Sequence, residues 1–409
     1  MKNPTLFEQA RRVFPGWTDP HTGLTVLRLA PPGEPTWPRR FATPYHQQRP
    51  FLDGGRWVLL REYPPPDSGP KGYQSILIDL TTGRIERPFP PGAHAWDVDA
   101  TTGLALINHS VEGWFTTSLF DITERRIRAS LALEPNWQWA SGTLLTDGRR
   151  AILSHYQGRF YDEPCRSHFH RMTADQDEAP IIFELDGIFA NHLVACPADP
   201  DLFAYNAWPT PKRDVEGVTA VATPDGRLNR VIALAPQTPR PGNFYAVRDH
   251  YVWTPDGRRI VSYFSPEPIY PTVPFNHFLF DWWISALDWR TGEDLFARYP
   301  PGRWGGHIQV TPDSRYILAA GGPGYDWLYA IAIDEMKQGW NEHRLCRYPP
   351  THSKGTNGDP FPYPFALPDG SGVLFNAGWP GPDHGLYLAE WPCTLTPAVR
   401  PAEAVAATP

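Results

Sequence analysis

Short runs of alternating apolar and polar residues follow one another along most of this chain, and tight turns separate them. The clearest runs are HYVWTPDGRRIVSYF from His250, HIQVTPDSRYILAAG from His307 and YPFALPDGSGVLFNAG from Tyr363. In each of them an alternating segment meets a Pro-Asp turn and a second apolar segment follows, which is the pattern of a β-hairpin. The sequence therefore predicts strands joined by tight turns over most of its length.

One polar or aromatic residue stands five positions before the turn in each of these runs. Counting back in the same way from weaker turns gives a series that recurs every 45 to 58 residues, by subtraction of the positions: Gln47, Trp96, Ser141, His192, His250, His307 and Tyr363. Each unit also holds a second hairpin, for example SILIDLTTGRIERPF. Seven units of four strands predict an all-β fold, a seven-bladed β-propeller of four-stranded antiparallel blades.

The sequence predicts one propeller domain over residues 1–395, in which the segment from Phe14 to Leu29 supplies a strand that closes the ring. Length alone would suggest two or three domains, but repeat folds made of strands are often long single domains. Only two short stretches, Thr5 to Val13 and Glu335 to Gly339, look helical. The end of the chain, residues 396–409, is rich in Pro and Ala and is expected to be disordered.

Composition narrows the classes of function. The formal charge of −7 argues against a nucleic-acid-binding protein, which would show a basic stripe. The start of the chain lacks the apolar run of a signal peptide and no run reaches the length of a membrane span, so we expect a cytoplasmic protein without membrane contact. The four cysteines lack the paired spacing of a zinc site and are expected to be buried thiols. The oligomeric state stays open.

Seventeen tryptophans are more than hydrophobic cores usually need. Aromatic faces stack on sugar rings, so some of them could line a sugar-binding groove, with packing between blades as the alternative for most. Trp96 and Trp208 are our candidates for sugar contacts, together with Gln47.

The innermost strand of each propeller blade lines the axis, so the seven residues of the series are expected to surround it. Three of them are histidines from consecutive blades and the next is Tyr363, although any single histidine is more often structural. Arg248 lies two positions before His250 and would share its strand face. Its guanidinium would fit a carboxylate, or pair with Asp249 instead.

This set of residues suits β-elimination at a uronic acid. The proton on C5 is acidic because the adjacent carboxylate accepts charge, so the site needs a cation at the carboxylate and a base at C5. Histidine and tyrosine are suitable bases. The leaving oxygen at C4 then takes a proton from a second group or from water, and the partner would be an acidic oligosaccharide.

Four stretches resemble the oligogalacturonate lyase family, seven-bladed propellers that cleave short pectin fragments by metal-assisted β-elimination. They are YHQQRPFLDGGRWVLL from Tyr45, NHLVACPADPDLFAYNAWP from Asn191, DHYVWTPDG from Asp249 and HSKGTNGDPFPYPFALPDGSGVLFNAGWPGPDHGLYLAEWP from His352. The resemblance spans most of the chain, and its specific parts lie in the fifth and seventh blades.

By this resemblance, His250 takes the position of the catalytic base and His307 that of a ligand to a divalent metal ion, normally manganese. In place of the family's His-Pro-His-Pro this chain has Phe-Pro-Tyr-Pro, with Phe361 and Tyr363 at the two histidine positions. The family's ligand set is therefore incomplete in this chain.

Two forms of the reaction remain. A rebuilt metal site would use His307, Gln309 and His352. A reaction without metal would place Arg248 or Arg213 at the substrate carboxylate. Proton transfer would fall to His250, Tyr363 and His192.

Other functions stay open. A non-catalytic propeller that binds carbohydrate or a protein partner would have kept the fold and lost the metal. A hydrolase or isomerase is a weaker alternative, because a propeller alone does not select the chemistry. Three further histidines are not expected at the axis. His46 would reach it only if the register of the first blade shifts by one residue, and His168 and His170 are expected in a surface loop.

Overall fold

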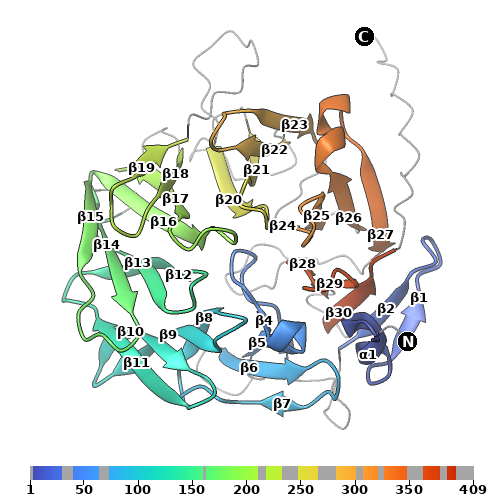
Figure 1. The fold of residues 1–409 in the computed structure, drawn as a ribbon, viewed down its shortest axis with the longest axis horizontal. Helices are drawn as coiled ribbons and strands as arrows, with labels where there is room; N and C mark the ends of the chain where they lie inside the picture. The colour runs from blue at the N-terminus through green and yellow to red at the C-terminus, as the bar shows by residue number, and fades with distance from the viewer. Residues whose placement is uncertain are drawn as a thin grey trace.

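Seven antiparallel sheets stand like blades around a common centre (Figure 1). This computed structural model describes residues 3–29, 40–63, 73–159, 163–210, 218–232, 247–265, 282–300, 307–320, 327–347, 363–377 and 385–392. Five of the sheets have four strands and two have five. The all-β, seven-bladed β-propeller predicted from the sequence is thus confirmed.

The strands follow the chain from blade to blade. Blades one and two contain β3 (Arg40–Ala42), β4 (Phe51–Leu52), β5 (Trp57–Tyr63), β6 (Gln74–Asp79), β7 (Ile85–Glu86), β8 (His94–Val98), β9 (Leu104–Val111), β10 (Trp114–Asp121) and β11 (Arg126–Ala132). Blades three and four contain β12 (Gln138–Leu144), β13 (Arg150–Gln157), β14 (Arg166–Thr173), β15 (Ile181–Asp186), β16 (Ile188–Ala195), β17 (Phe203–Pro209), β18 (Val218–Ala222) and β19 (Asn229–Val231).

Blades five to seven follow in the same manner. They contain β20 (Val247–Trp253), β21 (Arg259–Ser265), β22 (Trp283–Asp288), β23 (Asp294–Arg298), β24 (Ile308–Val310), β25 (Tyr316–Ala320), β26 (Trp327–Ala332), β27 (Glu342–Arg347), β28 (Phe365–Ala366), β29 (Gly372–Ala377) and β30 (Gly385–Glu390). The remaining elements are β1 (Gly16–Thr18), β2 (Thr25–Arg28), and the short helices α1 (Leu6–Arg11), η1 (Asp53–Gly55) and η2 (Ile333–Gln338).

The first and last strands of the chain meet in blade seven. Its sheet runs in the order β1-β2-β30-β29-β28, so the N-terminal strand β2 pairs with β30. Leu27 and Leu388 are direct partners in this pair, and both are buried. Main-chain hydrogen bonds between distant parts of the chain therefore complete this blade, which protects an edge that would otherwise be exposed.

The Pro-Asp turns are built by the side chains of the sequence pattern. In blade five the Thr254 hydroxyl donates to the Asp256 carboxylate, which also accepts from the main-chain N–H two residues further on. Gly257 between them has a φ of +67°, a conformation that strains other residues. Blade six repeats the same contacts with Thr311 and Asp313.

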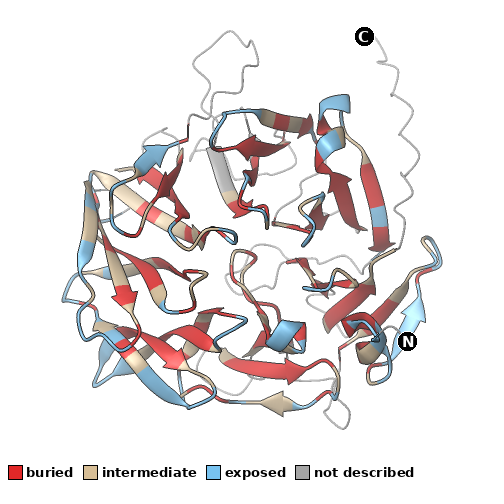
Figure 2. Cartoon of the chain, in the orientation of Figure 1, coloured by how far each residue is buried: buried red, intermediate tan, exposed pale blue. Residues whose placement is uncertain are grey.

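Apolar side chains fill the spaces between neighbouring blades. The middle strands are mostly buried, whereas several outermost strands, such as β1, β11 and β19, are largely exposed (Figure 2). Of the four cysteines expected to be buried thiols, Cys165, Cys196 and Cys346 are buried and free, and Cys393 lies outside the described residues. No helix among the described residues is long and apolar enough to cross a membrane.

Candidate functional site

The innermost strands of four blades each hold one extra residue relative to their neighbours. These bulges lie between Ala95 and Asp97, Trp139 and Ser141, Asn191 and Val194, and Asp249 and Val252. In the last two, His192 and His250 adopt a φ of 52°. A bulge re-aims the side chain that it contains, and histidine occurs in this backbone region more often than most residues. The fourth and fifth blades thus present histidines at equivalent positions.

Blade one departs from this pattern, because its innermost segment is a loop. Strands β3 and β4 both pair with β5, and residues 43–50 between them extend toward the centre of the ring (Figure 1). We call residues 43–50 the central loop. Three consecutive residues of this loop, Tyr45, His46 and Gln47, take part in the site.

Contacts with all six other blades hold the central loop. Its partners are Asn376 in blade seven, Ile308 and Gln309 in blade six, Tyr251 in blade five, His192 in blade four, Leu144 in blade three and Asp97 in blade two. The strongest contact is the ion pair between Arg49 and Asp97, whose closest atoms are 2.7 Å apart. The Asp97 side chain is only 4% exposed and the Arg49 side chain 33%, so the pair ties the loop to a buried carboxylate.

Six aromatic rings from five blades gather at the centre of the ring. We call them the central cluster: Tyr45, His46, His192, His250, His307 and Tyr363. The centroid of Tyr45 lies 4.6–5.9 Å from those of the other five. His250 lies 5.1 Å from His192 and 4.7 Å from His307. Tyr45, His192 and His250 are partly exposed, so one side of the cluster is accessible to solvent.

The hydrogen bonds of His46 define its tautomer. Its Nδ1 lies 3.2 Å from the carbonyl oxygen of Ile308, which can only accept, so Nδ1 bears a proton and Nε2 has the lone pair. This Nε2 is buried and has no hydrogen-bond partner among the described residues. Burial, together with the neighbouring His250 and His192, holds the pKa of His46 well below its usual value, so the ring is neutral.

His192 is oriented in the same way by Gln47. The Gln47 amide nitrogen donates to the carbonyl oxygen of Tyr251 at 2.9 Å, which leaves its Oε1 as the atom 2.6 Å from His192 Nδ1. Because an amide oxygen only accepts, His192 has its proton on Nδ1 and its lone pair on Nε2. The third ring, His250, bonds through Nδ1 to the hydroxyl of Tyr263.

Three histidines of the cluster could hold a metal ion. His46, His250 and His307 come from blades one, five and six, and their ligand atoms lie within 4.8 Å of one another. The buried lone pair on His46 fits a divalent cation, since ligating imidazoles typically donate their other nitrogen to a protein group. Of the residues expected as ligands, His307 belongs to this group, whereas Gln309 donates to the main-chain carbonyl of His46.

Five of the seven residues in the repeat series meet at the centre: Gln47, His192, His250, His307 and Tyr363. The other two make contacts between blades. Trp96 donates from its indole to the carbonyl oxygen of Gly142 at 2.7 Å, and the Ser141 hydroxyl accepts from the N–H of Leu193 at 3.0 Å. Trp96 therefore packs between two blades, which was the alternative to a sugar contact.

Trp208 lies near the site but is 6% exposed, and its indole donates to Asn191, the neighbour of His192. It therefore offers little surface to a sugar. Several sequence candidates fall outside the described residues, namely Arg213, His352, Phe361, the side chain of Arg248 and the tail 396–409.

Two residues of the central cluster, Tyr45 and His46, do not belong to the series of seven residues that the sequence predicted around the axis. The only signal for them was their place next to Gln47 in the stretch that resembles the lyase family. They reach the centre because the central loop leaves the sheet, so a strand register does not apply to it.

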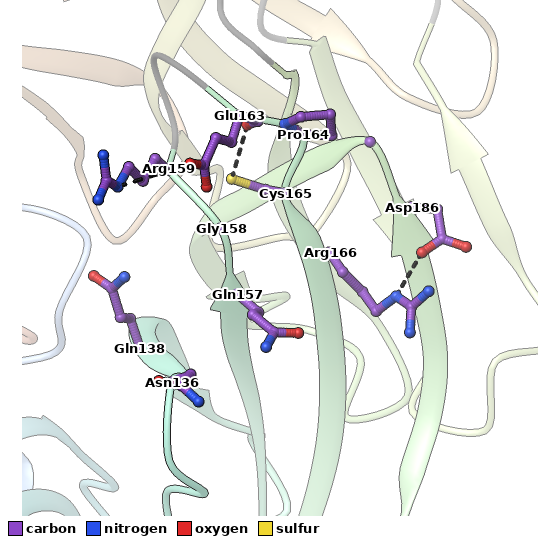
Figure 3. A pocket seen from close by; sticks show the side chains of 11 residues that line it. Asn136, Gln138, Gln157, Gly158, Arg159, Glu163, Pro164, Cys165, Arg166 and Asp186 are labelled. Atoms are coloured by element: carbon purple, nitrogen blue, oxygen red, sulfur yellow. Dashed lines mark hydrogen bonds and ion pairs between the residues drawn. The ribbon is translucent and has the colours of Figure 1, made fainter.

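A separate polar pocket of about 810 Å³ opens at one end of blade three (Figure 3). Three carboxamides, Asn136, Gln138 and Gln157, line it together with Arg166 and Asp186, whose side chains are paired at 2.7 Å. No residue of the central cluster lines this pocket.

Comparison with solved structures finds the same fold in oligogalacturonate lyases. A structure described as oligogalacturonate lyase in complex with manganese is 20% identical, with a TM-score of 0.67 over 93% of this chain and 96% of that chain. An oligogalacturonate lyase from Vibrio parahaemolyticus is 17% identical, with a TM-score of 0.67 over 94% and 98%. Hydrazine synthase from Kuenenia stuttgartiensis is 13% identical, with a TM-score of 0.52 over 82% and 93%.

No protein-family model and no curated protein sequence matches the chain. Identities of this size show a shared fold and not a shared activity. The resemblance to the oligogalacturonate lyase family that the motifs indicated is therefore confirmed at the level of the fold, which extends over nearly the whole chain.

Proposed function

We propose that this protein is a lyase that cleaves a uronate-containing oligosaccharide by β-elimination. The observation that supports this most is the central cluster, in which four histidines and two tyrosines from five blades meet on a partly exposed face. Bases and acids close together in one place are what proton removal at C5 and proton delivery at the leaving oxygen require.

In the reaction, a base removes the proton from C5, a double bond forms between C4 and C5, and the bond from C4 to the glycosidic oxygen breaks. The family resemblance puts the base at His250. His192 is also partly exposed and has its lone pair on Nε2, so it is suited to the same step. The leaving oxygen takes a proton, for which the phenols of Tyr363 and Tyr45 are suited.

The substrate carboxylate needs a positive partner while charge develops on it. Arg248 and Arg213 are the candidates from the sequence. A divalent ion held by His46, His250 and His307 would polarise the carboxylate as a Lewis acid. The likeness in fold to a lyase solved with manganese makes this second source the more specific one to test.

Absorbance of the unsaturated product tests the proposal directly. Purified protein is incubated with oligogalacturonate, glucuronan and ulvan fragments, with chelator or with added divalent metal ions. We expect cleavage of at least one substrate, a large loss of rate in His192→Ala and Tyr363→Phe, and no loss in His21→Ala, whose side chain is exposed and remote in sequence from the cluster. Intact substrates under every condition would refute the proposal.

A second function, carbohydrate binding without cleavage, is favoured by the pocket in blade three. Its carboxamides and its Arg166–Asp186 pair offer donors and acceptors that match sugar hydroxyls. This function predicts that calorimetry detects oligosaccharide binding without turnover, and that Gln138→Ala and Gln157→Ala weaken it. Binding that these variants leave unchanged would remove the pocket from consideration.

A further inference from the structure

We propose that His46, His250 and His307 form a metal centre that prefers a zinc-like ion to manganese. The site itself stands on the geometry of these three residues. One consequence, a division of roles between His250 and His192, rests on the proposed lyase function.

The contacts behind two of the three rings, His46 and His250, match those of metal-ligating histidines. Such rings typically donate one nitrogen to a carbonyl or another polar group and bind the ion with the other. His46 donates Nδ1–H to the carbonyl oxygen of Ile308, and His250 bonds through Nδ1 to the hydroxyl of Tyr263, which is 5% exposed. Nε2 is therefore the nitrogen that each of these two rings would offer to an ion.

The Nε2 atom of His46 is the most specific indication of a ligand. It is buried, it has a lone pair, and it lacks a hydrogen-bond partner among the described residues. Leaving a buried polar atom unpaired is unfavourable, because the atom has lost its hydrogen bonds to water. Two further imidazoles offer ligand atoms within 4.8 Å, and a cation bound by all three would satisfy this atom.

The donor atoms favour one class of metal. Imidazole nitrogens suit zinc, copper, iron and nickel, whereas manganese and magnesium are better matched by carboxylate, carbonyl and water oxygens. Among the described residues, no Asp or Glu belongs to the group of His46, His250 and His307. Three imidazoles with room for a further ligand are typical of catalytic zinc sites.

The proposed centre changes the assignment of the base. A His250 whose lone pair is bound to an ion cannot also take the proton from C5. His192 lies 5.1 Å from His250 between ring centroids, is partly exposed and is held by Gln47 with its lone pair on Nε2. His192 then acts as the base, and His250, which the family resemblance marks as the base, acts as a ligand.

Metal titration of the untagged full-length chain tests the centre. Protein freed of metal with a chelator is titrated calorimetrically with zinc chloride and with manganese chloride, and the cobalt-loaded protein is examined by absorption spectroscopy for imidazole ligation. We expect one strong zinc site, tighter than manganese by about 100-fold or more. His46→Ala and His307→Ala should lose it, and His21→Ala should retain it.

Two further variants distinguish loss of a ligand from loss of the fold. His46→Gln removes the imidazole but keeps a polar side chain, so it should lose the zinc site like His46→Ala, and circular dichroism shows whether each variant is folded. Tyr263→Phe removes only the hydroxyl behind His250 and should weaken zinc binding by about 10–100-fold without abolishing it. No zinc binding by the folded wild type, tighter binding of manganese, or full zinc affinity in His46→Ala would overturn the proposal.

Two outcomes separate this proposal from the lyase function. Zinc-loaded protein that leaves every uronate substrate intact refutes the lyase function while the metal centre stands. Cleavage by protein that binds no metal refutes the centre while the lyase function stands. His192→Ala should bind zinc like the wild type and lose cleavage, and loss of zinc binding in this variant would contradict the assigned roles.

Discussion

The Nδ1 atom of His192 lies 2.6 Å from Oε1 of Gln47, a contact that joins the innermost strand of blade four to the central loop of blade one. The amide nitrogen of Gln47 is already bonded to the carbonyl oxygen of Tyr251, so the amide cannot turn without losing both contacts. Gln47 therefore sets the tautomer of His192 and places the lone pair on the nitrogen that would accept a proton.

Gln47→Leu should lower kcat by about 10–100-fold and change KM little, because His192 keeps its place but loses its fixed tautomer. Gln47→Glu restores an oxygen that accepts from Nδ1 and should recover part of the rate. Initial rates at several substrate concentrations measure both constants. A rise in KM with unchanged kcat would mean that Gln47 binds the sugar, as the sequence suggested, and does not position His192.

Arg49→Met should destabilise the protein by about 3 kcal/mol, because it leaves the buried Asp97 carboxylate without its charged partner. The central loop would loosen, so activity should fall as well. Arg84→Met is the matched control, since its pair with Glu86 is exposed and contributes less than about 1 kcal/mol. Urea unfolding compares the two variants, and equal effects would contradict the role of Arg49 as an anchor.

The buried imidazole of His155 should make the protein less stable in acid. Its neighbours are His168 and His170, which the sequence suggested for a surface loop but which lie on strand β14. His168 is the direct strand partner of His155, and the ring centroids of His170 and His155 are 5.1 Å apart. Burial, and then the charges of His170 and His168, lower the pKa of His155 to about 3. Unfolded His155 takes a proton near pH 6.5, whereas folded His155 stays neutral down to about 3.

The stabilisation from a neutral His155 is thus complete above pH 6.5 and is lost as the pH falls toward 3, at about 1.4 kcal/mol per pH unit. His155→Gln should flatten this part of the stability profile. Urea unfolding at pH 7 and pH 5 measures the slope, with His21→Ala as the control. A slope unchanged by His155→Gln would contradict the assigned pKa.

Gly257→Ala should cost more than Gly292→Ala, although both glycines have a positive φ. A methyl group at Gly257 would lie 2.7 Å from Sγ of Cys196 in the turn between β16 and β17 of blade four, whereas one at Gly292 meets nothing within 4 Å. We expect about 1 kcal/mol for the backbone at either position and about 1–3 kcal/mol more for the overlap at Gly257. Equal losses in the free energy of unfolding would contradict this packing between neighbouring blades.

The regular spacing of the turns and strands predicted the fold and much of the site, because turn residues and strand alternation are local properties of the chain. It placed His192, His250 and His307 at equivalent points of three blades, and these rings meet at the centre. The spacing failed at His46, since no local pattern shows that residues 43–50 leave the sheet.

The repeat series also included Trp96, which lies in a bulge of the innermost strand of its blade, as His192 does. Its indole turns to the carbonyl oxygen of Gly142 in the next blade instead of the centre. The direction of a bulged side chain depends on the partners that neighbouring blades offer, and spacing along the sequence does not contain this information.

The central claim, proton removal from C5 by the histidine cluster, is tested most directly by the products formed in water labelled with heavy oxygen. Mass spectrometry of a cleaved uronate oligosaccharide should show an unsaturated end and no label, and His192→Ala should form none of this product. Saturated products that contain the label would reveal a hydrolase and contradict the account, and a wild-type rate no higher than that of His192→Ala would exclude His192 as the base.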